Sequence, residues 1–240
     1  MKFFFITFFL LGFVYNSQVK SQEILSNIIV LVDFSTSYFL PEKKKKLKKT
    51  LKKVNQAVIK GVDNLPLNMA IQFLPIKEES IVSDTICEVV FARRNLAGNQ
   101  VGDDGISKKR DLKRFLNDCT KLILKQNEGK ATDLTGAIRK AVLMANSQVP
   151  KGEPRVIVIL SDFVEERGRD FKQESKQSLN DFSFALIYPG QLELNDANLA
   201  SEVKNRADSL KSKLLNQGAK NVELYLEDGL FQNKIANELF

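Results

Sequence analysis

Hydrophobic and polar positions alternate in blocks along this chain. Two short runs, 28–32 and 156–160, are apolar at every position, and each runs within two residues into an aspartate. A strand without polar positions must be covered on both faces, so these runs predict buried strands over 27–33 and 156–160 in a parallel sheet. Shorter apolar runs predict further strands over 67–74, 85–92, 184–188 and 222–226.

Between these runs, apolar residues recur every three or four positions, as in helices that cover a core. Four such helices are expected before the C-terminus: one carrying Leu47 to Val58, one carrying Leu112 to Ile123, one starting after Thr132 and one carrying Leu199 to Leu214. A closing helix is expected over 230–239, and 93–107 is expected to be a loop. The alternation predicts a layered α/β domain. Pro75 and a polar connection join strands 67–74 and 85–92, which suits a hairpin with the second strand at the edge.

The N-terminal segment has the pattern of a signal peptide. Lys2 precedes an apolar stretch over 3–15, which is too short to span a bilayer comfortably, and small residues follow near position 21. The sequence therefore predicts a cleaved signal peptide over 1–21, a single domain over 22–240 and a secreted or periplasmic protein. An uncleaved anchor is the alternative.

Composition narrows the function classes. The chain has 240 residues, of which 43% are hydrophobic and 27% charged, so it is neither disordered nor a disulfide-stapled miniprotein. It contains no histidine. This excludes Ser-His and Cys-His nucleophilic pairs and zinc sites built on imidazole.

Positive charge is concentrated in one segment. Loss of Lys2 and Lys20 with the signal peptide would lower the formal net charge from +7 to +5. A solvated helix face is the expected role of the cluster, and binding to an anionic surface is the alternative. No aromatic residues interleave with it, so specific nucleic acid recognition is not expected. The cluster consists of Lys43, Lys44, Lys45, Lys46, Lys48, Lys49, Lys52 and Lys53.

Cys87 and Cys119 are the only two cysteines. Export would permit a disulfide between them. Separate burial as small hydrophobic residues is the simpler interpretation of their positions, one in a predicted strand and one in the apolar stripe of a predicted helix. Sequence does not give the distance between them, so both alternatives stay open.

Oxygen-bearing side chains cluster where the two most apolar strands end. Asp33, Ser35 and Ser37 follow the first strand in an Asp-x-Ser-x-Ser pattern, Thr132 lies in a loop after Gly129, and Asp162 follows the strand over 156–160. The carboxyl ends of parallel strands meet at one edge of a sheet. Hard oxygen donors with few formal charges suit Mg²⁺ or Mn²⁺. The alternative for the first motif is a polar turn that caps the next helix.

These residues resemble the metal-ion-dependent adhesion site of the von Willebrand factor type A domain family, and the resemblance covers nearly the whole mature chain. It implies a Rossmann-like, doubly wound and mostly parallel sheet of about six strands, with one short antiparallel edge strand and helices on both faces. It also implies a metal held by Asp33, Ser35, Ser37, Thr132 and Asp162.

Two positions depart from the family pattern. Phe163 stands where the family usually has a glycine, which predicts crowding or altered loop movement. Ala131 replaces a second glycine before the threonine. Thr135 is an alternative to Thr132, which we prefer because it lies nearer Gly129 and before the predicted helix.

The resemblance implies an exported module that captures an acidic group of a partner protein through the metal, and no catalysis. One alternative is a structural subunit of an envelope or secretion assembly with a non-essential metal site. A lower alternative is a metal-dependent phosphoryl hydrolase, although Ser35 replaces the second aspartate of an Asp-x-Asp pair. The partner and the oligomeric state are not predicted.

Overall fold

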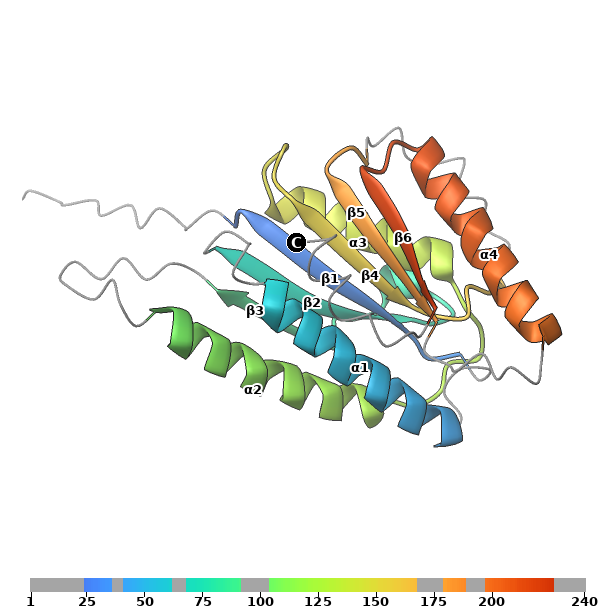
Figure 1. Ribbon diagram of the computed structural model, residues 1–240, viewed down its shortest axis with the longest axis horizontal. Helices are drawn as coiled ribbons and strands as arrows, with labels where there is room; N and C mark the ends of the chain where they lie inside the picture. The colour runs from blue at the N-terminus through green and yellow to red at the C-terminus, as the bar shows by residue number, and fades with distance from the viewer. Residues whose placement is uncertain are drawn as a thin grey trace, which may run out of the picture.

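Six strands form one sheet in the order β3-β2-β1-β4-β5-β6 (Figure 1). The computed structural model describes residues 24–35, 41–61, 68–91, 104–167, 179–188 and 197–226. The expected signal peptide, Ser37 and the expected closing helix lie outside these ranges. The strands are β1 (Ser26–Asp33), β2 (Met69–Ile76), β3 (Cys87–Phe91), β4 (Arg155–Leu160), β5 (Phe182–Tyr188) and β6 (Asn221–Leu226).

All neighbouring strands pair in parallel except β2 and β3, which are antiparallel. This confirms the predicted sheet of six strands with one antiparallel edge strand. From β1 the chain builds outward to β2 and β3, then crosses to the other side of β1 to place β4, β5 and β6. The order therefore reverses between β1 and β4, the position at which open α/β sheets form their binding crevices.

Each face of the sheet is covered by a pair of helices (Figure 1). Ile28, Val30 and Val32 pack with α1 (Pro41–Gly61) and α2 (Asp104–Leu124), whereas Ile29 and Leu31 pack with α3 (Leu134–Gln148) and α4 (Ala197–Asn216). Successive strand side chains point to opposite faces, so β1 can only be buried if both faces are covered. This explains why its apolar run is continuous.

The position of β2 differs from the sequence expectation. The strand was expected to stop before Pro75 but continues through it to Ile76. Pairing with β3 ends at Phe73, so Pro75 lies where β2 has a neighbour on one side only. A proline, which lacks a backbone N–H, is tolerated in such a position.

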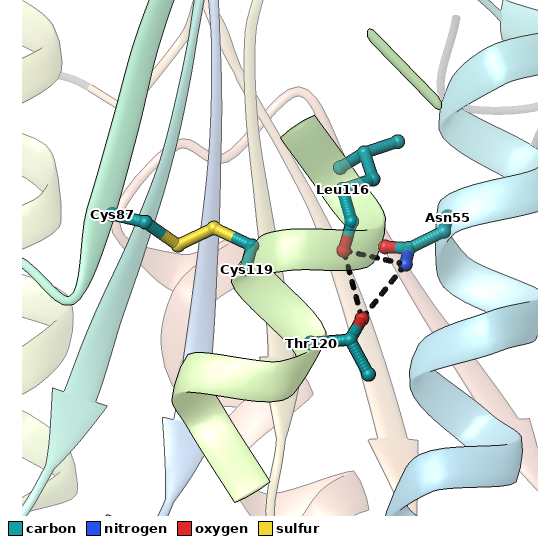
Figure 2. The surroundings of a disulfide bond; sticks show 5 residues. All are labelled: Asn55, Cys87, Leu116, Cys119 and Thr120. Atoms are coloured by element: carbon teal, nitrogen blue, oxygen red, sulfur yellow. Dashed lines mark hydrogen bonds between the residues drawn. A yellow bond between two sulfur atoms is a disulfide. The ribbon is translucent and has the colours of Figure 1, made fainter. Parts of the chain in front are cut away.

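A disulfide between Cys87 and Cys119 ties β3 to α2 (Figure 2). Their Cα atoms are 6.0 Å apart, within the range that the bond requires. Beside it, Asn55 Nδ2 on α1 donates to the Leu116 carbonyl at 3.3 Å and to Thr120 Oγ1 at 3.0 Å. The edge strand and both helices on this face are therefore joined by a covalent bond and by buried hydrogen bonds.

None of the helices in the described part of the chain combines the length and the apolar character needed to cross a membrane.

Candidate functional site

The candidate site lies at the point where the strand order reverses. Val32 of β1 lies opposite Leu160 of β4, so Asp33 and Ser161 are the next residues along the two strands. Asp162 follows directly. The fold therefore brings residues 33 and 162 to the same edge of the sheet, as their places at strand ends predict.

Asp33 is fully buried and held by its neighbours. Its Oδ1 accepts the Ser35 N–H at 2.8 Å, and its Oδ2 accepts the Ser161 hydroxyl at 2.7 Å. Burial raises the pKa of Asp33 to about 6; the hydrogen bonds from Ser161 and Ser35 lower this pKa and the charge of Asp162 raises it. The ionised carboxylate is therefore incompletely compensated, and a cation would offset the deficit.

Asp162 begins the loop that follows β4. Its Oδ1 accepts the Val164 N–H at 3.2 Å, and the side chain is partly exposed. Its charge is one of the causes that raise the pKa of Asp33. Ser161, between the strand and Asp162, was not among the predicted site residues.

Thr132 is buried in the loop before α3, and among the described residues its Oγ1 has no hydrogen-bond partner. Its N–H donates to Glu166 Oε2 at 2.9 Å, and its carbonyl accepts the Glu166 N–H at 3.1 Å. The Gly129 N–H donates to the Phe34 carbonyl at 2.7 Å. The loop with Thr132 is thus joined both to the segment after Asp33 and to the segment after Asp162.

Asp133 and Glu165 organise the start of α3. Asp133 is its N-cap: its Oδ1 accepts the Gly136 N–H at 2.9 Å and its Oδ2 accepts the Ser80 N–H at 3.1 Å. A side chain at Gly136 would collide with the Asp133 carboxylate. Thr135 lies in the first turn of α3, and Glu165 Oε2 accepts its N–H at 2.7 Å.

Sequence reasoning missed these supporting carboxylates. An aspartate directly before an apolar helical stretch is an N-cap signal, so Asp133 could have been predicted. Glu165 and Glu166 lie in an irregular loop without periodicity, and no sequence signal identifies their long-range partners.

Phe163 adopts a left-handed backbone conformation, with φ of 61°. Glycine adopts this conformation without the strain that a side chain brings, which is a physical reason for a glycine at this position. In this chain the phenylalanine ring is buried in the core between the sheet, α3 and α4. Its burial offsets the backbone strain.

The donor set of the site combines two carboxylates with neutral hydroxyls. It includes the carboxylates of Asp33 and Asp162 and the hydroxyls of Ser35 and Thr132, while Ser37 lies outside the described residues. In the described ranges no three acidic, cysteine or histidine side chains gather at one point. An ion here would therefore be held by two carboxylates, neutral hydroxyl oxygens and water, a combination that suits Mg²⁺ or Mn²⁺.

The predicted lysine cluster lies on α1, which covers one face of the sheet and begins eight residues after Asp33. Lys45, Lys46, Lys48, Lys49 and Lys52 are exposed, Lys44 and Lys53 are partly exposed, and the side chain of Lys43 is outside the described part.

No family model and no curated protein matches the sequence. Among solved structures, the chain is similar to VWA2, an ArnB paralogue from Sulfolobus acidocaldarius, with 12% identity and a TM-score of 0.48 over 92% of this chain and 46% of that one. A von Willebrand factor type A protein from Catenulispora acidiphila is 10% identical, with a TM-score of 0.43 over 90% and 42%. An aerotolerance-related membrane protein from Bacteroides fragilis is 13% identical, with a TM-score of 0.40 over 89% and 96%. The chain spans less than half the length of the first two proteins. At these identities and scores, the likeness carries no argument about function.

Proposed function

We propose that this chain is an exported, non-catalytic module that captures an acidic group of a partner protein through a bound Mg²⁺ or Mn²⁺ ion. The residues proposed to hold the ion are Asp33, Ser35, Ser37, Thr132 and Asp162. The observation that carries the proposal is the Thr132 hydroxyl, which is buried and has no hydrogen-bond partner in the described part of the chain, in a loop joined to both aspartate-bearing segments. Leaving such a group unsatisfied is costly, and a metal ion would satisfy it.

The charge balance of the site supports the same proposal. Asp33 and Asp162 would bring a divalent ion close to formal neutrality, and the neutral hydroxyls would leave it able to attract one more anionic oxygen. A glutamate or aspartate of the partner would supply that oxygen. The ion would provide the attraction, while the protein fixes the ligands.

Hydrogen bonds in the described residues explain how the ligands would be held. Ser161 and the Ser35 N–H orient Asp33, and the Val164 N–H orients Asp162. Glu166 holds Thr132 through both its N–H and its carbonyl. Three of the proposed ligands, Asp33, Asp162 and Thr132, are therefore positioned by neighbouring groups.

Thr132 fits the proposed role better than Thr135. The Thr132 side chain is buried and its hydroxyl finds no partner among the residues that the structure describes, whereas the Thr135 side chain is partly exposed and its N–H donates to Glu165. This supports the preference drawn from the sequence.

A pull-down from native extract tests the proposal. We expect the wild-type protein to recover a partner in Mg²⁺ and to lose it in EDTA. Asp162→Ala and Thr132→Val should lose it in both buffers. Asp208→Ala, which changes an exposed carboxylate on α4, is the matched control and should behave as wild type. Recovery that persists in EDTA and in both site variants would contradict metal-mediated capture and favour the structural-subunit alternative.

A further inference from the structure

Helices α1 and α2 together carry a larger net positive charge than the whole chain. The two helix sequences contain fifteen basic and four acidic residues, a net charge of +11. The whole chain has a net charge of +7, so everything outside these two helices is net negative. By comparison, α3 and α4 contain six basic and two acidic residues.

The two helices form one continuous basic face. They lie side by side on the same face of the sheet (Figure 1), joined through the hydrogen bonds of Asn55 on α1 with Leu116 and Thr120 on α2. Each helix has 21 residues, which corresponds to about 30 Å of length. Exposed cations occur on both, among them Lys45 and Lys52 on α1 and Arg110 and Lys113 on α2.

The lysines at the start of α1 lie where positive charge is electrostatically unfavourable. Lys43, Lys44, Lys45 and Lys46 occupy the first turns of the helix, where the helix dipole is positive and cations are unfavourable. They also repel one another. Residues that lower local stability often serve a function. A ligand with many negative charges would relieve this repulsion.

A hollow on α2 adds a place for an anionic headgroup. It has a volume of about 490 Å³ and is lined by Arg110, Lys113, Arg114 and Lys121, with Asn117 and Asp118. Lys121 pairs with Asp118 at 2.8 Å, and Arg110 Nε lies 3.8 Å from Asp111 Oδ1, so the four cations outnumber these two carboxylates. A phosphate group would find several cations in reach.

We propose that the face formed by α1 and α2 binds the surface of an anionic lipid bilayer. An extended face two helices wide suits a flat surface better than a single acidic loop. Leu122 is the one large hydrophobic residue of the described part of these helices that is strongly exposed, so adsorption rather than insertion is expected. The face uses none of the residues proposed to hold the ion, so the inference does not depend on the proposed function.

Vesicle co-sedimentation of the full chain tests this inference. The protein should sediment with vesicles of equal parts phosphatidylglycerol and phosphatidylcholine, but not with phosphatidylcholine alone. Binding should survive EDTA, because it does not use the metal site. It should be lost when salt is raised from about 0.1 M to about 1 M, where the Debye length falls from about 10 to about 3 Å.

Charge-neutralising variants locate the binding face. Each removed cation should weaken binding about fivefold, so either helix variant should bind about 100-fold more weakly, whereas an equal charge loss on α4 should have a much smaller effect. The three variants are Lys45→Gln/Lys48→Gln/Lys52→Gln on α1, Arg110→Gln/Lys113→Gln/Arg114→Gln on α2 and Lys204→Gln/Lys211→Gln/Lys213→Gln on α4.

Three outcomes would overturn the inference. Equal binding to vesicles with and without phosphatidylglycerol would show that negative charge on the bilayer does not drive binding. An equal loss of vesicle binding in the α4 control and in the α1 and α2 variants would show that binding depends on net charge rather than on this face. Binding to soluble polyglutamate but not to anionic vesicles would identify the face as a site for an acidic protein instead. Far-ultraviolet circular dichroism and thermal unfolding of each variant exclude misfolding as the cause.

Discussion

Asp33, at the end of β1, is fully buried and is also proposed to bind a metal ion as a charged carboxylate. Its place after a continuous apolar run made it a candidate ligand from sequence alone. Its burial and its acceptance of the Ser161 hydroxyl depend on residues far along the chain and could not be predicted. Because its pKa is raised to about 6, its charged form destabilises the metal-free protein.

Asp33→Asn should stabilise the metal-free protein. The folded-state pKa lies above the value of about 3.9 expected in the unfolded chain, so wild-type stability gains from this residue as pH falls from above 6 toward 4. We expect Asp33→Asn to raise the free energy of unfolding by about 1–3 kcal/mol at pH 7.5 in EDTA. At pH 5 the advantage should be smaller by about 1 kcal/mol.

Denaturant unfolding in EDTA at the two pH values checks this prediction. Asp208→Asn removes an exposed carboxylate and serves as the control, with no comparable change expected. An Asp33→Asn protein less stable than wild type at pH 7.5 would show that the buried charge is already compensated.

Phe163 shows how a departure from a family pattern acquires a physical meaning. The sequence indicated only that a large residue replaced the usual glycine. The structure adds a left-handed backbone and a buried ring, two effects of opposite sign.

Substitutions at Phe163 should reverse the usual order of alanine and glycine. Alanine loses the buried ring and keeps the backbone strain, so it should cost about 3–5 kcal/mol. Glycine loses the ring but relieves the strain, so it should be about 1 kcal/mol more stable than alanine. Thermal unfolding of both variants measures this. A glycine variant less stable than the alanine variant would mean that the conformation at this position is not strained.

At the scale of elements, apolar runs predicted the six strands of the described sheet, because burial against covering helices selects apolar side chains. The polar connection after Pro75 predicted the hairpin that places β3 at the edge. Strand ends were less certain: β2 extends through Pro75 because β3 has already stopped pairing. The link between Cys87 and Cys119 was undecided, since it depends on how closely α2 approaches β3.

Removing the disulfide should destabilise the protein without changing its fold. It closes a loop of 32 residues between β3 and α2. For such a loop the chain-entropy model gives about 3–4 kcal/mol. Urea unfolding of Cys87→Ala/Cys119→Ala should show this loss, and dithiothreitol should destabilise wild type but not the variant. If dithiothreitol leaves wild type unchanged, the two cysteines are not linked in the folded protein.

At the scale of the whole molecule, the parallel topology turns distant sequence positions into neighbours. Asp33 and Asp162 meet because β1 and β4 are adjacent at the reversal of strand order. That meeting was predictable once both were placed at strand ends. The hydrogen bonds that Glu165 and Glu166 accept from the Thr135 and Thr132 N–H groups were not predictable, because they depend on the path of an irregular loop.

We expect this edge of the sheet to hold one divalent ion, and titration calorimetry with Mg²⁺ and with Mn²⁺ measures that uptake. Wild type should bind one ion per chain, Thr132→Val should bind at least about tenfold more weakly, and Asp33→Asn should show no binding. Thr135→Val is the matched control and should bind as wild type. A folded wild-type protein that takes up neither ion would show that these residues do not form a metal site.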